Sequence, residues 1–442
     1  MAGQWDFNGV KAQEETAMDK RYAALIQDDR VHGSLYTDAD VFADEMDRIF
    51  RRGWVFVGHD SEIPKPGDWV TRQVGREPVI MVRDREETIR VLANRCAHRG
   101  NRLCWREAGH GNAFQCIYHG WTFGLDGSLR AVSHKAGFER DRAEMPLDRA
   151  GQVDRYRGFV FANMSGDAGP LGDHLAAGGQ DLIDRLCDLS PTGNIRLSAG
   201  WIGHRVESNW KMWPESDSDG YHLDFVHASM LRAQPDNYYH DTVIGGEQAN
   251  VSRAVDHGGG HVELDLRPSY ARELAWLGVG RDRVGAYCDA MVARYGQERA
   301  DRLLWDGPPH GFIFPNLFLG EVNVARIDPV DVGSMVHAHT VIQLEGVDDA
   351  LNRRLLRQSE AALGPASFIV PDDAIIAERM QLGFQGLRPP SNGDARRGWI
   401  DLSRGLSREQ RQADGTRTGH VSDEVTNRAF WQHYRHVMER RA

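Results

Sequence analysis

Two short segments of this chain each pair a cysteine with a histidine. The first reads Cys96-Ala97-His98 and the second reads Cys116-Ile117-Tyr118-His119. Such a set can hold a [2Fe-2S] cluster with thiolates on one iron and imidazoles on the other, which raises the reduction potential above that of an all-cysteine cluster. The same four ligand atoms could bind a structural zinc ion. Because zinc fingers usually pair Cys with Cys and His with His, the order favours the cluster, and therefore electron transfer.

A second group of metal-ligating side chains follows later. His222 and His227 lie five residues apart, and Asp219 precedes the first of them by three. Two histidines and one carboxylate on one face form a common site for ferrous iron that activates oxygen. Taken alone, two such histidines are more often ordinary core or surface residues. Because the Cys-His motif lies on the same chain, metal binding becomes the favoured interpretation. Five residues of a regular helix turn by about 140°, so the rings converge only if the helix is broken, and we predict a bulge or break there.

The periodicity of the chain indicates which elements position these groups. A helix is expected over about 38–52, opened by Thr37 and Asp40 as a near capping box. Short alternating segments split by Gly, Pro and Asp then predict a small antiparallel β domain with the two Cys-His loops at one end. Helical patterns follow over about 351–363 and 422–438. We therefore divide the chain into an N-terminal segment that packs on the last domain, a cluster domain and an iron domain: 1–50, 51–165 and 166–442.

Composition narrows the class of protein. The chain has 442 residues with a formal net charge of −11, which argues against nucleic-acid binding because phosphate contacts need clustered Lys and Arg. No apolar run is long enough to span a membrane, and the polar, acidic start resembles neither a signal peptide nor a transit peptide. The expected location is the cytoplasm, where the remaining cysteines would be reduced and structural: Cys104, Cys187 and Cys288.

These segments resemble the large (α) subunit of Rieske non-haem iron aromatic-ring-hydroxylating oxygenases. The resemblance rests on Cys-Ala-His-Arg-Gly at 96–100, on Cys-Ile-Tyr-His-Gly-Trp-Thr-Phe at 116–123, and on Asp-x2-His-x4-His at Asp219, His222 and His227. Within the family, the chain is most similar to the benzoate, anthranilate, salicylate and terephthalate group. The resemblance implies an α+β fold, in which a small all-β Rieske domain precedes a larger catalytic domain of helix-grip type, an antiparallel sheet flanked by helices.

The resemblance also implies the metal ligands. The third iron ligand comes from the segment 371–381, where Asp373 fits the family pattern and Asp372 is the alternative. Ser216 departs from the family, which usually has Asn after the Glu at this position, so the role of an amide near the iron stays open. The implied ligands of the Rieske cluster are Cys96, His98, Cys116 and His119. The implied ligands of the mononuclear Fe(II) are His222, His227 and Asp373.

Asp219 acquires a specific role from the same resemblance. In the family, three α subunits form a ring in which the cluster of one subunit lies close to the iron of its neighbour. Asp219 is then expected to join His222 of one subunit to His119 of the adjacent one through imidazole N–H donors. The plain alternative is an aspartate that caps a helix or faces solvent.

The implied activity needs partner proteins. NADH or NADPH reduces a separate flavin reductase, with or without a ferredoxin, and the electrons reach the cluster and then the iron. With O2 as cosubstrate, an aromatic ring is hydroxylated to a cis-dihydrodiol or a phenol. A small β subunit is expected, giving α3β3. A Rieske electron carrier or metal-binding protein without oxygenase activity is the alternative from another class, and Fe content would separate them.

Substrate identity depends on weaker signals. An aromatic carboxylate is favoured, with an aromatic amine or a hydrocarbon as alternatives. Arg326 is a possible partner for the carboxylate, because arginine binds carboxylates through a bidentate fork. Other residues could line an apolar slot for a planar ring, although each fits an ordinary core equally well: Leu223, Met230, Leu231, His310 and Phe312. The remaining histidines of the later domain are expected to be structural: His204, His337 and His339.

Overall fold

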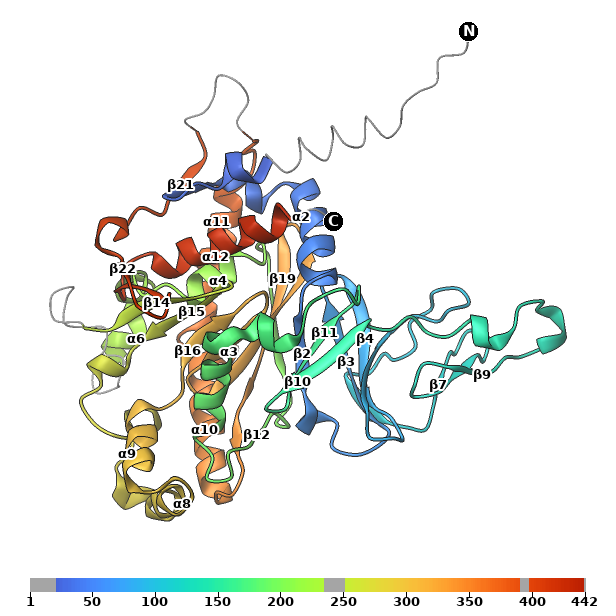
Figure 1. The fold of residues 1–442 in the computed structure, drawn as a ribbon, viewed down its shortest axis with the longest axis horizontal. Coiled ribbons are helices and arrows are strands. Elements are labelled where there is room, and N and C mark those ends of the chain that lie inside the picture. The colour runs from blue at the N-terminus through green and yellow to red at the C-terminus, as the bar shows by residue number, and fades with distance from the viewer. Residues whose placement is uncertain (1–20, 234–250, 390–396, 441–442) are drawn as a thin grey trace, which may run out of the picture.

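The computed structural model describes residues 21–233, 251–389 and 397–440. A smaller β-rich domain lies beside a larger domain of mixed structure, on the right and the left of Figure 1. The fold is α+β, as predicted, with the β-rich domain ahead of the larger one. None of the described helices is long and apolar enough to cross a membrane.

The β-rich domain consists of three small antiparallel sheets, as predicted. Their strand orders are β5-β4-β3-β6, β7-β8-β9 and β10-β11-β2. In β3 (Asp68–Val74) buried and more exposed residues alternate, which is the period of two expected for a strand with one buried face. The other strands are β2 (Val55–His59), β4 (Glu77–Arg83), β5 (Ile89–Ala93), β6 (Ala108–His110), β7 (Phe114–Gln115), β8 (Thr122–Phe123), β9 (Leu129–Ala131), β10 (Gln152–Tyr156) and β11 (Phe159–Asn163).

The larger domain is built on a nine-stranded antiparallel sheet. Its order is β13-β19-β18-β17-β16-β15-β14-β23-β22. The centre of the sheet is buried on both faces, because β17 and most of β18 and β19 carry no exposed side chain. The strands are β13 (Ile202–Val206), β14 (Arg253–Gly258), β15 (His261–Asp265), β16 (His310–Ile313), β17 (Leu317–Gly320), β18 (Asn323–Asp331), β19 (Ser334–Val341), β22 (Gln410–Arg411) and β23 (Arg417–His420).

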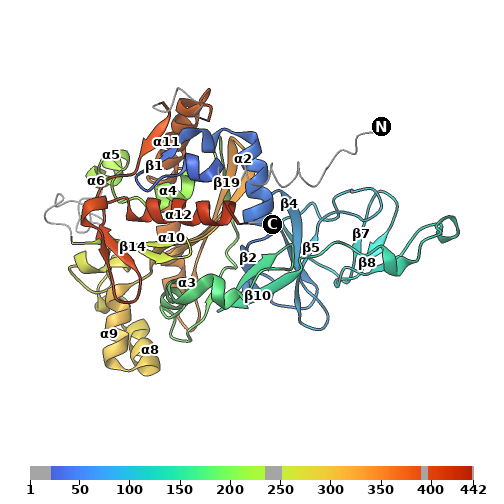
Figure 2. The ribbon, with the colours of Figure 1, turned by 45° about the horizontal axis from the view of Figure 1, so that its top comes forward.

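Helices cover this sheet. Both helices predicted in the second half of the chain are present, as α10 (Asp349–Leu363) and α12 (Val425–Met438). Helix α10 packs against β19, and α12 crosses β14 and β15. The remaining longer helices are α3 (Leu171–Cys187), α8 (Gly285–Tyr295), α9 (Gln297–Asp306) and α11 (Val370–Phe384). Figure 2 shows α12 and α3 on the sheet, with α8 and α9 projecting away from it.

The predicted helix near 38–52 is present, with a different N-cap and a change of helix type along its length. Asp38, rather than Thr37, is the N-cap, because its Oδ1 accepts hydrogen bonds from the backbone N–H groups of Asp40 and Val41. Helix α2 (Ala39–Glu45) then continues into a π-helical stretch, Met46–Arg51. The helix packs Ile49 and Phe50 into the main core.

Glu45 joins three distant parts of the chain. Its carboxylate accepts hydrogen bonds from Trp210 Nε1 at 2.8 Å, Lys211 Nζ at 2.5 Å and Tyr434 Oη at 2.6 Å. Glu45, Lys211 and Tyr434 are all fully buried. A buried ion pair is tolerated only when such hydrogen bonds satisfy the charges. Residues 21–51 are therefore held against the segment before the candidate iron ligands and against α12. Nearby, β1 (Arg30–His32) also pairs with β21 (Trp399–Asp401).

Candidate metal centres and substrate cavity

The two Cys-His loops make the same turn. The N–H of Gly100 donates to the carbonyl of Cys96 at 2.9 Å, and the N–H of Gly120 donates to the carbonyl of Cys116 at 2.9 Å. Both glycines have a φ near +70°, namely 72° and 71°, which side chains other than glycine rarely adopt. The loops follow β5 and β7, so the strands place two equivalent turns face to face.

The donor atoms of these loops converge. Nδ1 of His98 lies 3.2 Å from Nδ1 of His119, as expected for two ligands of one iron. Cys96 and Cys116 are free and buried, and Asn101 Nδ2 lies 3.6 Å from the sulfur of Cys116. Around one zinc ion, all four atoms would lie about 4 Å apart. In the described part of the chain, no three of these atoms meet within 4.8 Å, so the spread fits a two-iron cluster better.

The predicted distortion of the helix is present, but it lies at the two histidines and not between them. Helix α4 ends at Asp217, and a single helical turn, α5 (Leu223–Val226), follows after a short irregular stretch. His222 is the N-cap of this turn and His227 is its C-cap, with a φ of −97° and a ψ of 20°. Helix α6 (Ala228–Ala233) begins next. Because each histidine stands at an end of one turn, both rings can face the same point.

His222, His227 and Asp373 meet at that point. Nε2 of His222 and Nε2 of His227 lie 3.3 Å apart. Oδ1 of Asp373, from the first turn of α11, lies 3.6 Å and 3.3 Å from these two atoms. Asp372 instead approaches the other nitrogen of His227 at 3.9 Å and is much more exposed. Among residues 21–233, 251–389 and 397–440, this is the one cluster of three such ligands within 4.8 Å, and it has the donor set of a 2-His-1-carboxylate iron site.

Two polar contacts orient these side chains. Oδ2 of Asp219 lies 3.1 Å from Nδ1 of His222, and its Oδ1 accepts the backbone N–H of Tyr221 at 2.6 Å. Burial lowers the pKa of His222, but Asp219 more than offsets this and holds that pKa above its usual value. Ser216, where the family usually has Asn, places its hydroxyl 3.4 Å from Asp373 Oδ1.

Glu215 belongs to the support of this centre, and sequence reasoning missed its partners. Tyr36 Oη donates to one carboxylate oxygen at 2.6 Å, and Trp431 Nε1 donates to the other at 2.5 Å. Burial raises the pKa of Glu215 to about 7. Both donors lie roughly two hundred residues away in sequence, so no local pattern could reveal them.

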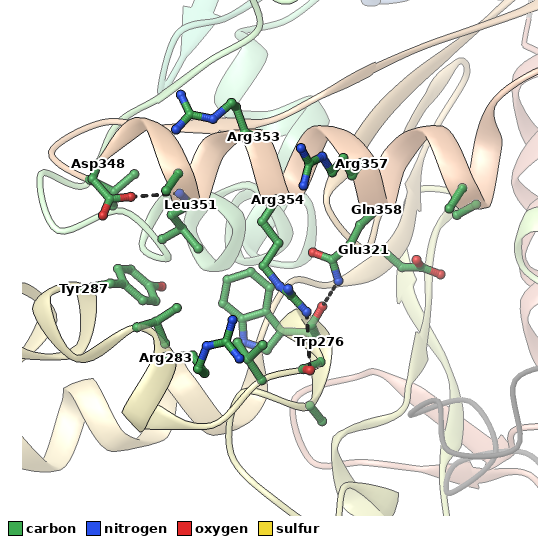
Figure 3. Close-up of a pocket in the computed structure, with 18 of the residues that line it drawn as sticks. Trp276, Arg283, Tyr287, Glu321, Asp348, Leu351, Arg353, Arg354, Arg357 and Gln358 are labelled. Atoms are coloured by element: carbon green, nitrogen blue, oxygen red, sulfur yellow. Dashed lines mark hydrogen bonds between the residues drawn. The ribbon is translucent and has the colours of Figure 1, made fainter.

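A cavity of about 1090 Å3 is lined by residues that neighbour the candidate iron ligands in sequence, although none of His222, His227 and Asp373 is itself in its wall. Its wall includes Met230, three residues after His227, and Ile369, four residues before Asp373. Figure 3 shows α10 along one side of the cavity and Trp276 facing it. The described residues of the wall include two acids, Glu321 and Asp348, and five arginines: Arg272, Arg283, Arg353, Arg354 and Arg357.

Arg354 is the most firmly held of these arginines. Its Nε donates to the carbonyl of Leu277 at 2.8 Å, and its Nη2 lies 3.4 Å from the carbonyl of Gly278. A guanidinium has five N–H groups, so most of its donors stay available to a ligand. Figure 3 shows Arg354 reaching from α10 towards Trp276, with Arg283 close by. Arginines thus reach the cavity both from α10 and from the segment that faces it.

The residues predicted to line the substrate slot are only partly found there. Met230 lines the cavity, whereas Leu223 and Leu231 pack behind it in a small apolar cluster. Phe312 is fully buried in the main core, and His310 is held by the backbone carbonyl of Asp217 at 2.9 Å. Neither of these last two is a wall residue of the cavity.

Arg326 is a correction. Its Nε donates to Asp328 Oδ2 at 2.9 Å, and its guanidinium lies over the ring of Trp201, so it is already engaged within the chain. On β18 it pairs with Ala338, and it therefore faces away from His337 and His339, which flank Ala338 on β19. Arg326 is not a wall residue of the cavity, whose arginines come from other positions. His204, His337 and His339 lie against one another on the sheet, and the last two are buried.

Comparison with known proteins agrees with this geometry. Residues 53–140 match the model of the Rieske [2Fe-2S] domain, and residues 193–440 match that of the ring hydroxylating alpha subunit (catalytic domain). The chain is 36% identical to the N,N-dimethyl phenylurea N-demethylase subunit alpha of Sphingobium sp. (strain YBL2), over 78% of each chain. It is 29% identical to the 2-halobenzoate 1,2-dioxygenase large subunit of Burkholderia cepacia, over 88% of this chain and 84% of that one.

Solved structures show the same fold. Naphthalene 1,2-dioxygenase from Rhodococcus sp., bound to indole, superposes with a TM-score of 0.79 at 21% identity, covering 96% of this chain and 98% of that one. The family model of the catalytic domain spans more than half of the 442 residues. This chain therefore belongs to the family of ring-hydroxylating oxygenase α subunits, and carries a Rieske [2Fe-2S] domain ahead of its catalytic domain.

Proposed function

We propose that this chain is the terminal oxygenase of a multicomponent cytoplasmic system that hydroxylates an aromatic carboxylate with O2. Electrons come from a separate NAD(P)H-dependent flavin reductase, directly or through a ferredoxin. The observation that carries the proposal is the meeting of His222, His227 and Asp373 within 4.8 Å, on a chain that also holds a Rieske domain. An electron carrier would need no such second site.

The proposal assigns each ligand a role. Cys96 and Cys116 hold one iron of the cluster, and His98 and His119 hold the other. The remaining three ligands, His222, His227 and Asp373, hold ferrous iron. When bound, the cluster supplies electrons and the ferrous iron activates O2. Asp219 fixes the ring of His222 by accepting its Nδ1–H, which leaves Nε2 as the ligand atom.

The two centres are proposed to work between copies of the chain. In both Figure 1 and Figure 2 the loops near β7 and the helix α6 lie at opposite ends of the molecule. Ile117 and Tyr118 are exposed beside the cluster ligands, and Phe225 is 79% exposed beside the iron ligands. Large exposed apolar side chains of this kind mark contact sites. A ring of three copies, each with a small β subunit, would bring His119 of one copy to Asp219 of the next.

An aromatic carboxylate suits the cavity. Five arginines against two acids favour an anion, and arginine binds a carboxylate through paired N–H donors. We propose that Arg354 and Arg283 hold the carboxylate while the ring extends past Met230 towards the iron. Relatives named for halobenzoate, toluate and anthranilate dioxygenases support this choice. Oxidative N-demethylation of an aryl urea is the second candidate, favoured by the relative at 36% identity.

Metal analysis and a substrate screen test the function. Purified holoenzyme is expected to contain about three Fe per chain, two in the cluster and one in the mononuclear site. Substrate-dependent O2 uptake with a surrogate reductase is compared for benzoate, 2-halobenzoate, aniline, naphthalene and N,N-dimethyl phenylurea. Hydroxylated acids support the proposal, formaldehyde release from the urea supports the second candidate, and about two Fe with no O2 uptake on any compound refutes both.

Two arginine variants test the carboxylate partner. Arg354→Leu and Arg283→Leu are expected to raise KM for the aromatic acid by about tenfold, the cost of one charge-assisted hydrogen bond, with a smaller change in kcat. Arg411→Leu, an exposed arginine on β22, is the control. An unchanged KM for the acid in both cavity variants would exclude these arginines as the carboxylate partner.

A further inference from the structure

An exposed loop beside the proposed cluster ligands carries an aromatic side chain next to an arginine. Trp105 is 69% exposed, and the guanidinium of Arg102 lies 5.5 Å from its ring. The loop begins at His98, one of the proposed cluster ligands. A tryptophan left in water on a folded chain is uncommon, because burying it is favourable, and such residues mark sites where another molecule docks.

The backbone of this loop is held by hydrogen bonds from a buried side chain. The buried Asn94 accepts the backbone N–H groups of Leu103 at 3.0 Å and Cys104 at 2.8 Å through its Oδ1, and its Nδ2 donates to the carbonyl of Cys104 at 2.8 Å. Leu103 and Cys104 are themselves buried. The next residue, Trp105, therefore projects from an anchored backbone. The exposure of Trp105 follows from the backbone conformation, since three hydrogen bonds hold the residues just before it.

The same loop carries unpaired positive charge. Arg99, Arg102 and Arg106 form no ion pair with any described residue, whereas the nearby Arg95 pairs with Glu77 and Asp148. One exposed acid, Glu107, follows the loop. The chain as a whole carries a formal net charge of −11. Three arginines on one loop of such a chain, without an ion pair to any described residue and close in sequence to a cluster ligand, favour an acidic partner.

We propose that Arg99, Arg102, Trp105 and Arg106, here called the donor patch, dock a small acidic iron–sulfur protein that reduces the cluster. This inference rests on the proposed function, since an oxygenase needs electrons from outside the chain. In each encounter the donor loses one electron and the cluster gains one. Ile117 and Tyr118, which we assign to contact with a neighbouring copy, lie on the other Cys-His loop. The donor patch and that contact are therefore carried by different loops.

The test uses holoenzyme and a reduced, acidic plant-type [2Fe-2S] ferredoxin as the probe. Its low potential makes reduction of a Rieske cluster favourable. In stopped-flow experiments at low ionic strength, the double variant Arg102→Glu/Arg106→Glu is expected to reduce the cluster at least about tenfold more slowly than the wild type. Added salt should slow the wild type steeply and the variant little. Arg411→Glu, with the same change per residue on the far domain, should behave as the wild type.

A binding measurement and a chemical reductant complete the design. Calorimetric titration with oxidised ferredoxin should show weaker binding for the double variant and for Trp105→Ala. Methyl viologen radical, a small cation, should reduce the cluster of every variant at least as fast as that of the wild type. If a glutamate variant loses its cluster absorbance, Arg102→Gln/Arg106→Gln replaces it and should show the same direction of change.

Two results would overturn the proposal. One is an unchanged rate and an unchanged affinity for ferredoxin in variants that retain their cluster. The other is dissociation of the oligomer in sedimentation, with normal ferredoxin reduction, which would assign the donor patch to contact between copies. Neither result would contradict the proposed function. Failure of that function would appear separately, as missing iron or missing O2 uptake.

Discussion

Asp219 shows how much one side chain contributes at the metal centres. It holds Nδ1 of His222 at 3.1 Å while its own side chain stays 23% exposed. A carboxylate with both properties can orient one ligand within the chain and still accept a second N–H from outside. Its position one residue before Gly220, whose Cα lies close to the backbone of Val421, leaves little freedom for this turn to shift.

The first prediction concerns this carboxylate. Asp219→Ala should retain cluster absorbance and bound iron, while turnover falls at least about 10–100-fold, the usual cost of losing a group that orients a metal ligand. Asp224→Ala, at an exposed aspartate on α5, should keep wild-type turnover. Normal product formation by the Asp219 variant would refute its role as a bridge.

At the scale of elements, the N-terminal helix, the segment before the iron ligands and the last helix meet at Glu45. The ion pair with Lys211 is fully buried, so its stability depends on keeping both charges and their hydrogen bonds together. This contact explains why helix α2 lies against the catalytic domain although it precedes the cluster domain in sequence. It also positions Trp210, five residues before Glu215.

Removal of one charge should therefore be costly. Lys211→Met leaves the Glu45 carboxylate buried without its cation and is expected to lower the free energy of unfolding by about 3–5 kcal/mol. Urea unfolding at pH 7, followed by tryptophan fluorescence, measures this change. Lys65→Met, at an exposed position, should change stability by less than about 0.5 kcal/mol. A Lys211 variant as stable as the wild type would show that the pair contributes nothing to holding these elements together.

The contact between α12, α3 and the sheet predicts a dependence on pH. Burial lowers the pKa of His261 to about 4 and the pKa values of His174 and His433 to about 3. His261 is fixed as a neutral ring, since its Nδ1 accepts the N–H of Phe314 and its Nε2 lies 2.7 Å from the carbonyl of His174. Between pH 6.5 and these values the unfolded chain binds more protons than the folded chain.

Stability should therefore fall as pH drops below about 6.5, by up to about 1.4 kcal/mol per pH unit for each such histidine. The measurement is the free energy of unfolding at several pH values between 7 and 5.5. His433→Asn, although less stable at pH 7, should show a slope smaller by about one proton. An identical slope in the two proteins would mean that His433 does not stay neutral in the folded chain.

The sequence predicted what depends on nearby residues and missed what depends on distant ones. The Cys-His pairs, the His222 and His227 spacing and the interruption of the helix at these histidines follow from local ligand chemistry and helical geometry. Arg326 was misjudged because its partner, Asp328, is a neighbour only on an extended strand, where alternate residues share a face. The arginine-rich wall was missed because its members come from residues 272, 283 and 353–357, which only the packing of α10 brings together.

At the scale of the whole molecule, the two centres lie at opposite ends of one chain in both views. Electron transfer within a chain would then be slower than transfer across a contact between copies. The exposed apolar residues at each end include Tyr118 and Phe225. They fit a head-to-tail arrangement in which the cluster of one copy lies beside the iron site of the next.

Mixed oligomers test this arrangement. Copies with Cys116→Ala lack an intact cluster, and copies with Asp373→Ala lack an iron ligand, so each variant alone should be inactive. When the two are coexpressed with different tags and purified for both, turnover should return to a measurable fraction of the wild-type rate. Inactive mixed oligomers of confirmed composition would indicate that each chain works with its own two centres.

Helix α12 has a consequence for how the protein is made. Trp431 and Tyr434 reach back to Glu215 and Glu45, and Thr426 donates to the carbonyl of Ser218, so the support of the iron centre includes residues up to Tyr434. The cluster loops, by contrast, need only strands that end at Asn163. During translation the first cofactor could be inserted into a nascent chain, whereas the second must wait until synthesis is nearly finished.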